Sequence, residues 1–133
     1  MRILQLHSDF IEYIPLKKEI DLAEEVEDKR RFRFEDILVL FISFEKEDDE
    51  GVVDLALEDL KEFLRKLKVN RILLYPFAHL SSNLAEPNLA LSLLKYMENR
   101  AKELGLEAYR APFGWNKQFS LQIKAHPLAE QSR

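Results

Sequence analysis

Short apolar segments alternate with longer amphipathic segments along the chain, and this pattern predicts an α/β fold. Runs or alternations of apolar residues predict β-strands at residues 2–7, 10–14, 37–44, 71–75, 107–111 and 119–124. The segment 37–44 is apolar at almost every position, which is typical of a central strand that is covered on both faces. The first two strands could form a hairpin around Ser8 and Asp9, and Pro15 is expected to end the second of them.

Two amphipathic helices are predicted between the later strands. Apolar residues recur at helical spacing from Val53 to Leu67, and Asn70 is a plausible end for this helix. The second helix is expected to begin at Pro87 and to end at Gly105, a residue suited to a left-handed cap. Because strands and helices alternate, some strands should pair in parallel, and ligands are expected at the loops that follow their carboxyl ends.

Residues 17–31 are dominated by charge and offer little to a core, which predicts a mobile excursion or a short helix with a solvated face. The chain as a whole has 133 residues, of which 47% are hydrophobic, and this fits a single domain over residues 1–133. The apolar runs are too short to span a bilayer and no secretory signal is visible, so we expect a soluble, cytoplasmic domain without membrane contact.

Charge and cysteine content narrow the possible chemistry. The net charge of −4 gives the surface no general attraction for nucleic acid, and the absence of cysteine excludes disulfides and thiolate nucleophiles. His126 and Glu130 are four residues apart, but Pro127 and the lack of a third nearby ligand argue against a metal site. No metal and no cofactor are therefore expected. No serine lies in a nucleophile elbow, which favours direct attack by water in any hydrolysis.

Two cationic candidates follow predicted strands or turns. His79 lies just beyond the strand that Pro76 ends, and Lys117 lies between Trp115 and Phe119. Taken alone, each has an ordinary interpretation: a hydrogen-bonded structural histidine, and a surface lysine whose aliphatic stem lies on aromatic rings.

Three segments change this assessment. They are Pro-Phe-Ala-His-Leu-Ser-Ser at 76–82, Ala-Pro-Phe-Gly-Trp-Asn-Lys-Gln-Phe at 111–119, and His-Pro-Leu-Ala-Glu at 126–130. In this order they resemble the N-terminal editing domain of archaeal threonyl-tRNA synthetase, a relative of D-aminoacyl-tRNA deacylases, over the whole of residues 1–133. The resemblance implies a D-aminoacyl-tRNA deacylase-like fold, in which two main helices pack on β-sheets, and it implies a homodimer. The end of the sequence at Arg133, shortly after His126 and Pro127, suggests a domain excised from a longer synthetase.

The resemblance also implies a function and a site. The function is proofreading: hydrolysis of L-serine from mischarged Ser-tRNA(Thr) by water attack on the aminoacyl ester. Lys117 would hold the substrate and support the oxyanion, His79 would orient water or the serine hydroxyl, and the ribose 2′-hydroxyl would assist. The implied substrate-binding residues are Ser43, Phe44, Glu45, Pro76, Phe77, Ala78, Phe113, Gly114, Trp115, Asn116, His126 and Glu130. The implied partners are the 3′ end of aminoacylated tRNA(Thr) and the catalytic and anticodon-binding domains of the synthetase.

The sequence departs from the family at three positions. Asn116 stands where the family usually has an aromatic residue, Ala125 where it has glycine, and Gln131 where it has leucine. Two alternatives therefore stay open: a D-aminoacyl-tRNA deacylase, and a non-catalytic module of the same fold that binds an amino acid or another protein.

Overall fold

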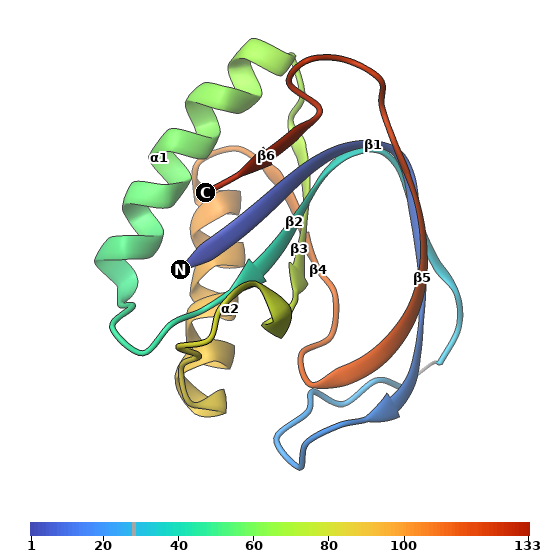
Figure 1. Ribbon diagram of the computed structural model, residues 1–133, viewed down its shortest axis with the longest axis vertical. Coiled ribbons are helices and arrows are strands. Elements are labelled where there is room, and N and C mark those ends of the chain that lie inside the picture. The colour runs from blue at the N-terminus through green and yellow to red at the C-terminus, as the bar shows by residue number, and fades with distance from the viewer. Residues whose placement is uncertain (28) are drawn as a thin grey trace.

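One bent, mixed β-sheet organises the fold, and both helices pack on the same face of it (Figure 1). The computed structural model describes residues 1–27 and 29–133. The strands are β1 (Arg2–Lys18), β2 (Phe32–Ser43), β3 (Arg71–Pro76), β4 (Glu107–Arg110), β5 (Trp115–Ile123) and β6 (Glu130–Ser132). The helices are α1 (Glu50–Leu67), α2 (Pro87–Glu103) and the short 3₁₀ helix η1 (Ala78–Leu80).

The sheet combines a parallel part with an antiparallel part. The strand order is β4-β3-β2-β1-β5, with β6 also paired to β1. Strands β2, β3 and β4 are parallel, as the alternating strands and helices predict, whereas β1 pairs antiparallel with β2, β5 and β6. The long strands β1 and β5 curve away from the helices, so the antiparallel part curls into a concave face (Figure 1).

The predicted hairpin at Ser8 and Asp9 is wrong, because residues 2–18 form one continuous strand. A shift in the pairing of β1 with β5 between Ser8 and Phe10 bends this strand without reversing it. Pro15 does not end the strand either. Pairing with β2 stops at Tyr13, so β5 alone flanks Pro15 and its missing N–H costs no bond to β2.

The core has two layers, one on each face of the sheet. Residues 37–44 are buried throughout, which confirms the doubly covered central strand. Between the sheet and the helices lies an aliphatic cluster that includes Leu40, Leu57 and Leu94, all fully buried. The concave face holds a second cluster rich in aromatic side chains, including Tyr13, Phe41 and Tyr75.

Both helices are confirmed, with small differences at their ends. Helix α1 begins at Glu50, because Asp49 accepts a hydrogen bond from the N–H of Val52 at 2.9 Å and caps it. It ends at Leu67, before Lys68 adopts a left-handed conformation. Helix α2 begins at Pro87 as predicted and ends at Glu103, shortly before Gly105. Neither helix is long and apolar enough, within the described part of the chain, to cross a membrane.

The prediction of an excursion or a short helix at residues 17–31 is wrong for the first residues of this range. Lys17 and Lys18 belong to β1, and the described residues after them contain no helix. Residues 19–24 are instead tied to the loop before β5: the N–H of Glu19 donates to Gly114 O at 2.8 Å, and the N–H of Glu24 donates to Phe113 O at 3.0 Å. Asp28, within the predicted segment, lies outside the described residues.

Candidate functional site

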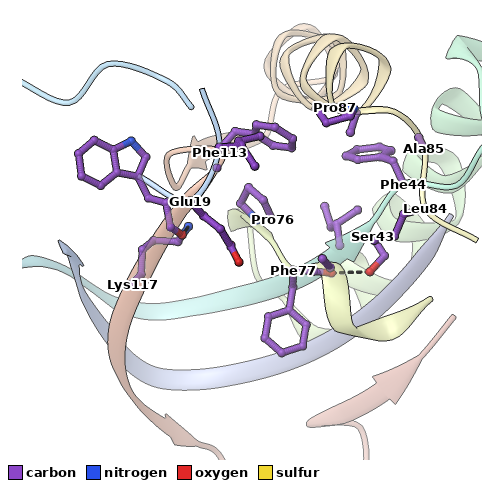
Figure 2. A pocket seen from close by; sticks show the side chains of 16 residues that line it. Glu19, Ser43, Phe44, Pro76, Phe77, Leu84, Ala85, Pro87, Phe113 and Lys117 are labelled. Carbon is purple, nitrogen blue, oxygen red and sulfur yellow. Dashed lines mark hydrogen bonds between the residues drawn. The ribbon is translucent and has the colours of Figure 1, made fainter. Parts of the chain in front are cut away.

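A mostly apolar cavity of about 310 Å³ lies at the carboxyl ends of β2 and β3 (Figure 2). Its position agrees with the expectation that ligands bind at the carboxyl ends of parallel strands. The residues that line it are Glu19, Ile20, Ile42, Ser43, Phe44, Pro76, Phe77, Ala78, Leu84, Ala85, Pro87, Ala90, Phe113, Gly114, Trp115 and Lys117. The ends of β2 and β3, the first turn of α2 and the segment before β5 therefore all contribute residues to this one cavity.

Lys117 supplies the cationic group of this cavity. Its Nζ donates hydrogen bonds to Pro112 O at 2.9 Å and to Trp115 O at 3.1 Å. The same nitrogen lies 4.9 Å from the centroid of the Tyr75 ring. Burial lowers the pKa of Lys117 to about 8, although the carboxylates of Glu19 and Glu24 act in the opposite direction. The ammonium is thus held in place inside the wall, which is not the situation of an ordinary surface lysine.

Ser43 fixes the opposite side of the cavity. Its hydroxyl is buried, donates to Phe77 O and accepts a hydrogen bond from the N–H of Leu80 at 3.3 Å. This links the end of β2 to the turn after β3, as the dashed line in Figure 2 shows. Ser43 is therefore a structural hydrogen-bonding group in the cavity wall.

Glu24 holds the turn that carries Phe113 and Gly114. Its carboxylate accepts from Arg110 at 2.6 Å and from the N–H of Phe113 at 3.0 Å, while its backbone oxygen accepts from the Trp115 indole at 2.6 Å. Gly114 has a φ of 81°, and a Cβ there would lie 2.8 Å from the Cα of Ala23. Only glycine fits this approach of the two segments without displacement.

Several predicted site residues lie outside this lining. His79 is exposed on η1, with its ring 5.0 Å from the Phe77 ring, and Asn116 is exposed on β5. Glu45 points its carboxylate to the N-terminal ammonium of Met1 at 2.8 Å and accepts from the Ser81 hydroxyl at 2.6 Å. Glu45 thus ties down the loop that leads to Leu84 and does not face the cavity.

His126 and Glu130 also lie elsewhere. The loop from β5 to β6 is at one end of the sheet, whereas the turn from β4 to β5 is at the other (Figure 1). His126 Nε2 lies 2.9 Å from His7 Nδ1, and Glu130 is exposed on β6, paired with Leu6. These contacts fasten the last strand to β1.

The sequence reasoning missed part of the cavity wall. Pro87 and Ala90 come from the first turn of α2, whose start was predicted without being placed at the site. Glu19 and Ile20 come from the charged segment that was interpreted as solvated. A usable signal was the pair Ile20 and Ala23, whose apolar side chains pack against Gly114.

Comparisons with known proteins agree with this architecture. The profile of the archaea-specific editing domain of threonyl-tRNA synthetase matches residues 1–133. The threonine–tRNA ligase of Nitrosopumilus maritimus is 50% identical over 133 residues, covering 100% of this chain and 21% of the ligase. The ligases of Thermococcus sibiricus and Methanocaldococcus jannaschii are 44% and 42% identical, again over 100% of this chain and 22% of each ligase. The chain thus spans about a fifth of the length of these relatives.

A solved structure, the c-Myc DNA Unwinding Element Binding Protein, superposes with a TM-score of 0.74 at 7% identity, covering 100% of this chain and 97% of that one. At this identity the similarity shows the fold alone, which is the D-aminoacyl-tRNA deacylase-like fold that the sequence resemblance implies. The fold alone does not identify the family. The family match over the full chain and the identities of 42–50% to archaeal ligases do so. The chain belongs to the family of archaea-specific editing domains of threonyl-tRNA synthetase.

Proposed function

We propose that this domain is a proofreading hydrolase that removes L-serine from mischarged Ser-tRNA(Thr). The observation that carries the proposal is the ammonium of Lys117, which two backbone carbonyls hold inside a small, mostly apolar cavity at the carboxyl ends of β2 and β3. A fixed cation in such a site stabilises the negative charge that develops on a carbonyl oxygen during ester hydrolysis. The partners would be the 3′ end of tRNA(Thr) and the catalytic and anticodon-binding domains of a cytoplasmic, homodimeric synthetase.

The need for such an activity follows from substrate size. Serine is threonine without one methyl group, and an apolar pocket discriminates a single methyl or methylene by only about 1–3 kcal/mol. A synthetic site that accepts threonine therefore also accepts some serine. A second, smaller site can remove the error because the correct product does not fit.

The chemistry needs few groups. Water attacks the carbonyl carbon of the ester, and the bond to the ribose oxygen breaks, which releases serine and free tRNA. Lys117 faces the carbonyl oxygen, and the ribose 2′-hydroxyl assists the departure of the leaving oxygen. His79, which follows the lining residue Ala78, orients water or the serine hydroxyl. Backbone groups of Ser43 and Ala78 hold the aminoacyl-adenosine end.

Hydrolysis of Ser-tRNA(Thr) and Thr-tRNA(Thr), measured side by side, tests the proposal. We expect serine to be released about 10- to 100-fold faster, because the additional methyl of threonine should collide with the cavity wall at Phe113 and Ala78. Single-turnover rates with the domain in excess give this ratio. Equal release of the two amino acids would rule out proofreading, and release of D-serine alone would favour the D-aminoacyl-tRNA deacylase.

The non-catalytic alternative rested on the departures near the proposed site, and their placement weakens it. Asn116 is exposed and lies outside the cavity lining, so the missing aromatic residue leaves the described wall intact. The backbone of Ala125 does not adopt a positive φ, so glycine is not required there. Binding without any hydrolysis would nevertheless restore this alternative.

Replacing His79 with alanine should reduce hydrolysis by about 10- to 100-fold, below the roughly 10²- to 10⁴-fold typical of a proton-transfer group, because His79 only orients water or the serine hydroxyl. Because the side chain is exposed on a short 3₁₀ helix, the free energy of unfolding should change by less than about 0.5 kcal/mol. Ser82→Ala, in the same loop and also exposed, is the matched control. Full activity in His79→Ala would remove this residue from the mechanism.

A further inference from the structure

Glu19 places a carboxylate in the cavity that the proposed chemistry has not used. It lines the cavity together with Lys117, and Figure 2 shows the two side chains on the same side of it. Its backbone is fixed, because its N–H donates to Gly114 O at 2.8 Å. The carboxylate makes no hydrogen bond or ion pair with residues 1–27 and 29–133.

The neighbouring acidic residue offers a contrast. The carboxylate of Glu24 accepts hydrogen bonds from Arg110 and from the N–H of Phe113, so it is already committed to holding the turn. Among the described residues of the cavity wall, only Glu19 and Lys117 carry a charge. The cavity thus presents one anion and one cation, and the described chain partners only the cation, through Pro112 O and Trp115 O.

This pair of charges matches the reacting end of an aminoacyl ester. Such an ester carries a cationic ammonium on the carbon next to the carbonyl, and the carbonyl oxygen becomes negative during hydrolysis. The two charges of the substrate are therefore adjacent and of opposite sign. An anion and a cation on one side of a mostly apolar cavity complement them.

We propose that Glu19 binds the α-ammonium of the aminoacyl group, while Lys117 faces the carbonyl oxygen of the same group. This inference rests on the proposed function and adds a specificity to it: the site selects esters with a free α-ammonium, whatever their side chain. The size of the wall then separates serine from threonine. Glu19 is thus a substrate-binding residue that acts on the common part of the amino acid.

The test compares substrates with and without the ammonium. Ser-tRNA(Thr) is matched with its glyceroyl counterpart, in which a hydroxyl of similar size replaces the ammonium, at a pH below about 7.7, where an ordinary α-amino group is protonated. We expect the wild-type domain to favour the seryl ester over the glyceroyl ester at least about 10-fold more than uncatalysed hydrolysis does, the value of one charge-assisted hydrogen bond. Glu19→Gln should remove this additional preference by slowing the seryl ester far more than the glyceroyl ester.

Asp21→Asn is the matched control, since Asp21 is an exposed carboxylate on the same segment and outside the cavity lining. A glyceroyl rate that falls much less than the seryl rate also shows that Glu19→Gln folds and keeps Lys117 in place. If Glu19→Gln slows both esters equally, the carboxylate acts through Lys117 or through the loop, and the inference is overturned.

A binding assay separates this inference from the proposed function. Two non-hydrolysable probes, the seryl and glyceroyl 3′-amides of 3′-amino-3′-deoxyadenosine, are titrated into wild type and Glu19→Gln by calorimetry. If the wild type binds the seryl amide more tightly, Glu19→Gln loses this preference and neither ester is hydrolysed, the inference about Glu19 stands and the proposed hydrolase is rejected. If the domain hydrolyses Ser-tRNA(Thr) but the binding preference survives in Glu19→Gln, the hydrolase stands and the inference is rejected. A wild-type domain without preference in either assay overturns the inference.

Discussion

Replacing Lys117 with methionine should slow the release of serine from Ser-tRNA(Thr) by about two orders of magnitude or more. Methionine keeps most of the aliphatic stem that packs by Tyr75 and removes the ammonium together with its hydrogen bonds to Pro112 O and Trp115 O. Loss of one prepositioned group at a developing oxyanion costs about 10²- to 10³-fold in rate. Single-turnover rates of wild type and Lys117→Met measure the effect, and Lys61→Met, on the exposed face of α1, is the control.

The stability of Lys117→Met separates a catalytic effect from misfolding. Burial lowers the pKa of Lys117 from 10.5 to about 8, so below pH 8 the lysine is protonated in both the folded and unfolded states and the cost of its burial is fully present. Between pH 8 and 10.5 the unfolded chain binds the additional proton, so the free energy of unfolding of the wild type should rise with pH. The methionine variant should therefore be at least as stable at neutral pH, with an advantage that shrinks across this window.

The activity should follow the opposite course. As pH rises through about 8, the wild type loses the ammonium, and its rate advantage over Lys117→Met should shrink. A methionine variant that is clearly less stable at neutral pH, or one with an unchanged single-turnover rate, would contradict the role of Lys117.

Local signals explain which parts of the fold were predictable. Pro87 marks the start of α2, and the apolar run at 37–44 identifies the central strand, because each signal acts within a few residues. The continuity of β1 was not predictable in this way. Ser8 and Asp9 form a polar pair typical of a turn, and only the pairing of β1 with both β2 and β5 turns them into a bend within a strand.

The residues of the candidate site likewise fall into those that local signals predict and those that only tertiary contacts place. Residues 76–78, 113–115 and 117 line the cavity, and they were predicted as site residues because parallel strands bring their carboxyl ends together and because their motifs resemble a known family. Glu19 escaped notice, since a charged segment normally remains solvated and nothing local shows that its backbone bonds to Gly114. His126 was expected near the pocket, but the pairing of β6 with β1 at Leu4–Leu6, a contact between the two ends of the chain, places it beside His7.

Gly114→Ala should destabilise the domain by about 2–5 kcal/mol and disturb the cavity at the same time. An alanine at a φ of 81° costs about 1–2 kcal/mol. Its Cβ would also lie 2.8 Å from the Cα and 2.9 Å from the Cβ of Ala23, and such overpacking costs about 1–3 kcal/mol more. Because Gly114 joins Phe113 to Trp115, relief of the overlap must move two residues of the cavity wall. Urea unfolding and single-turnover hydrolysis measure the two effects.

Gly105→Ala is a matched control for the backbone cost alone. Gly105 has a φ of 89°, but a Cβ there would have no atom within 4 Å, so only the conformational cost of about 1–2 kcal/mol should appear and hydrolysis should be unaffected. Adding Ala23→Gly to Gly114→Ala removes one of the two closest contacts and should recover part of the lost activity, because the segment at 19–24 can then approach the turn again. If Gly114→Ala loses no more stability than Gly105→Ala and hydrolyses Ser-tRNA(Thr) at the wild-type rate, the close packing of these two segments does not shape the site.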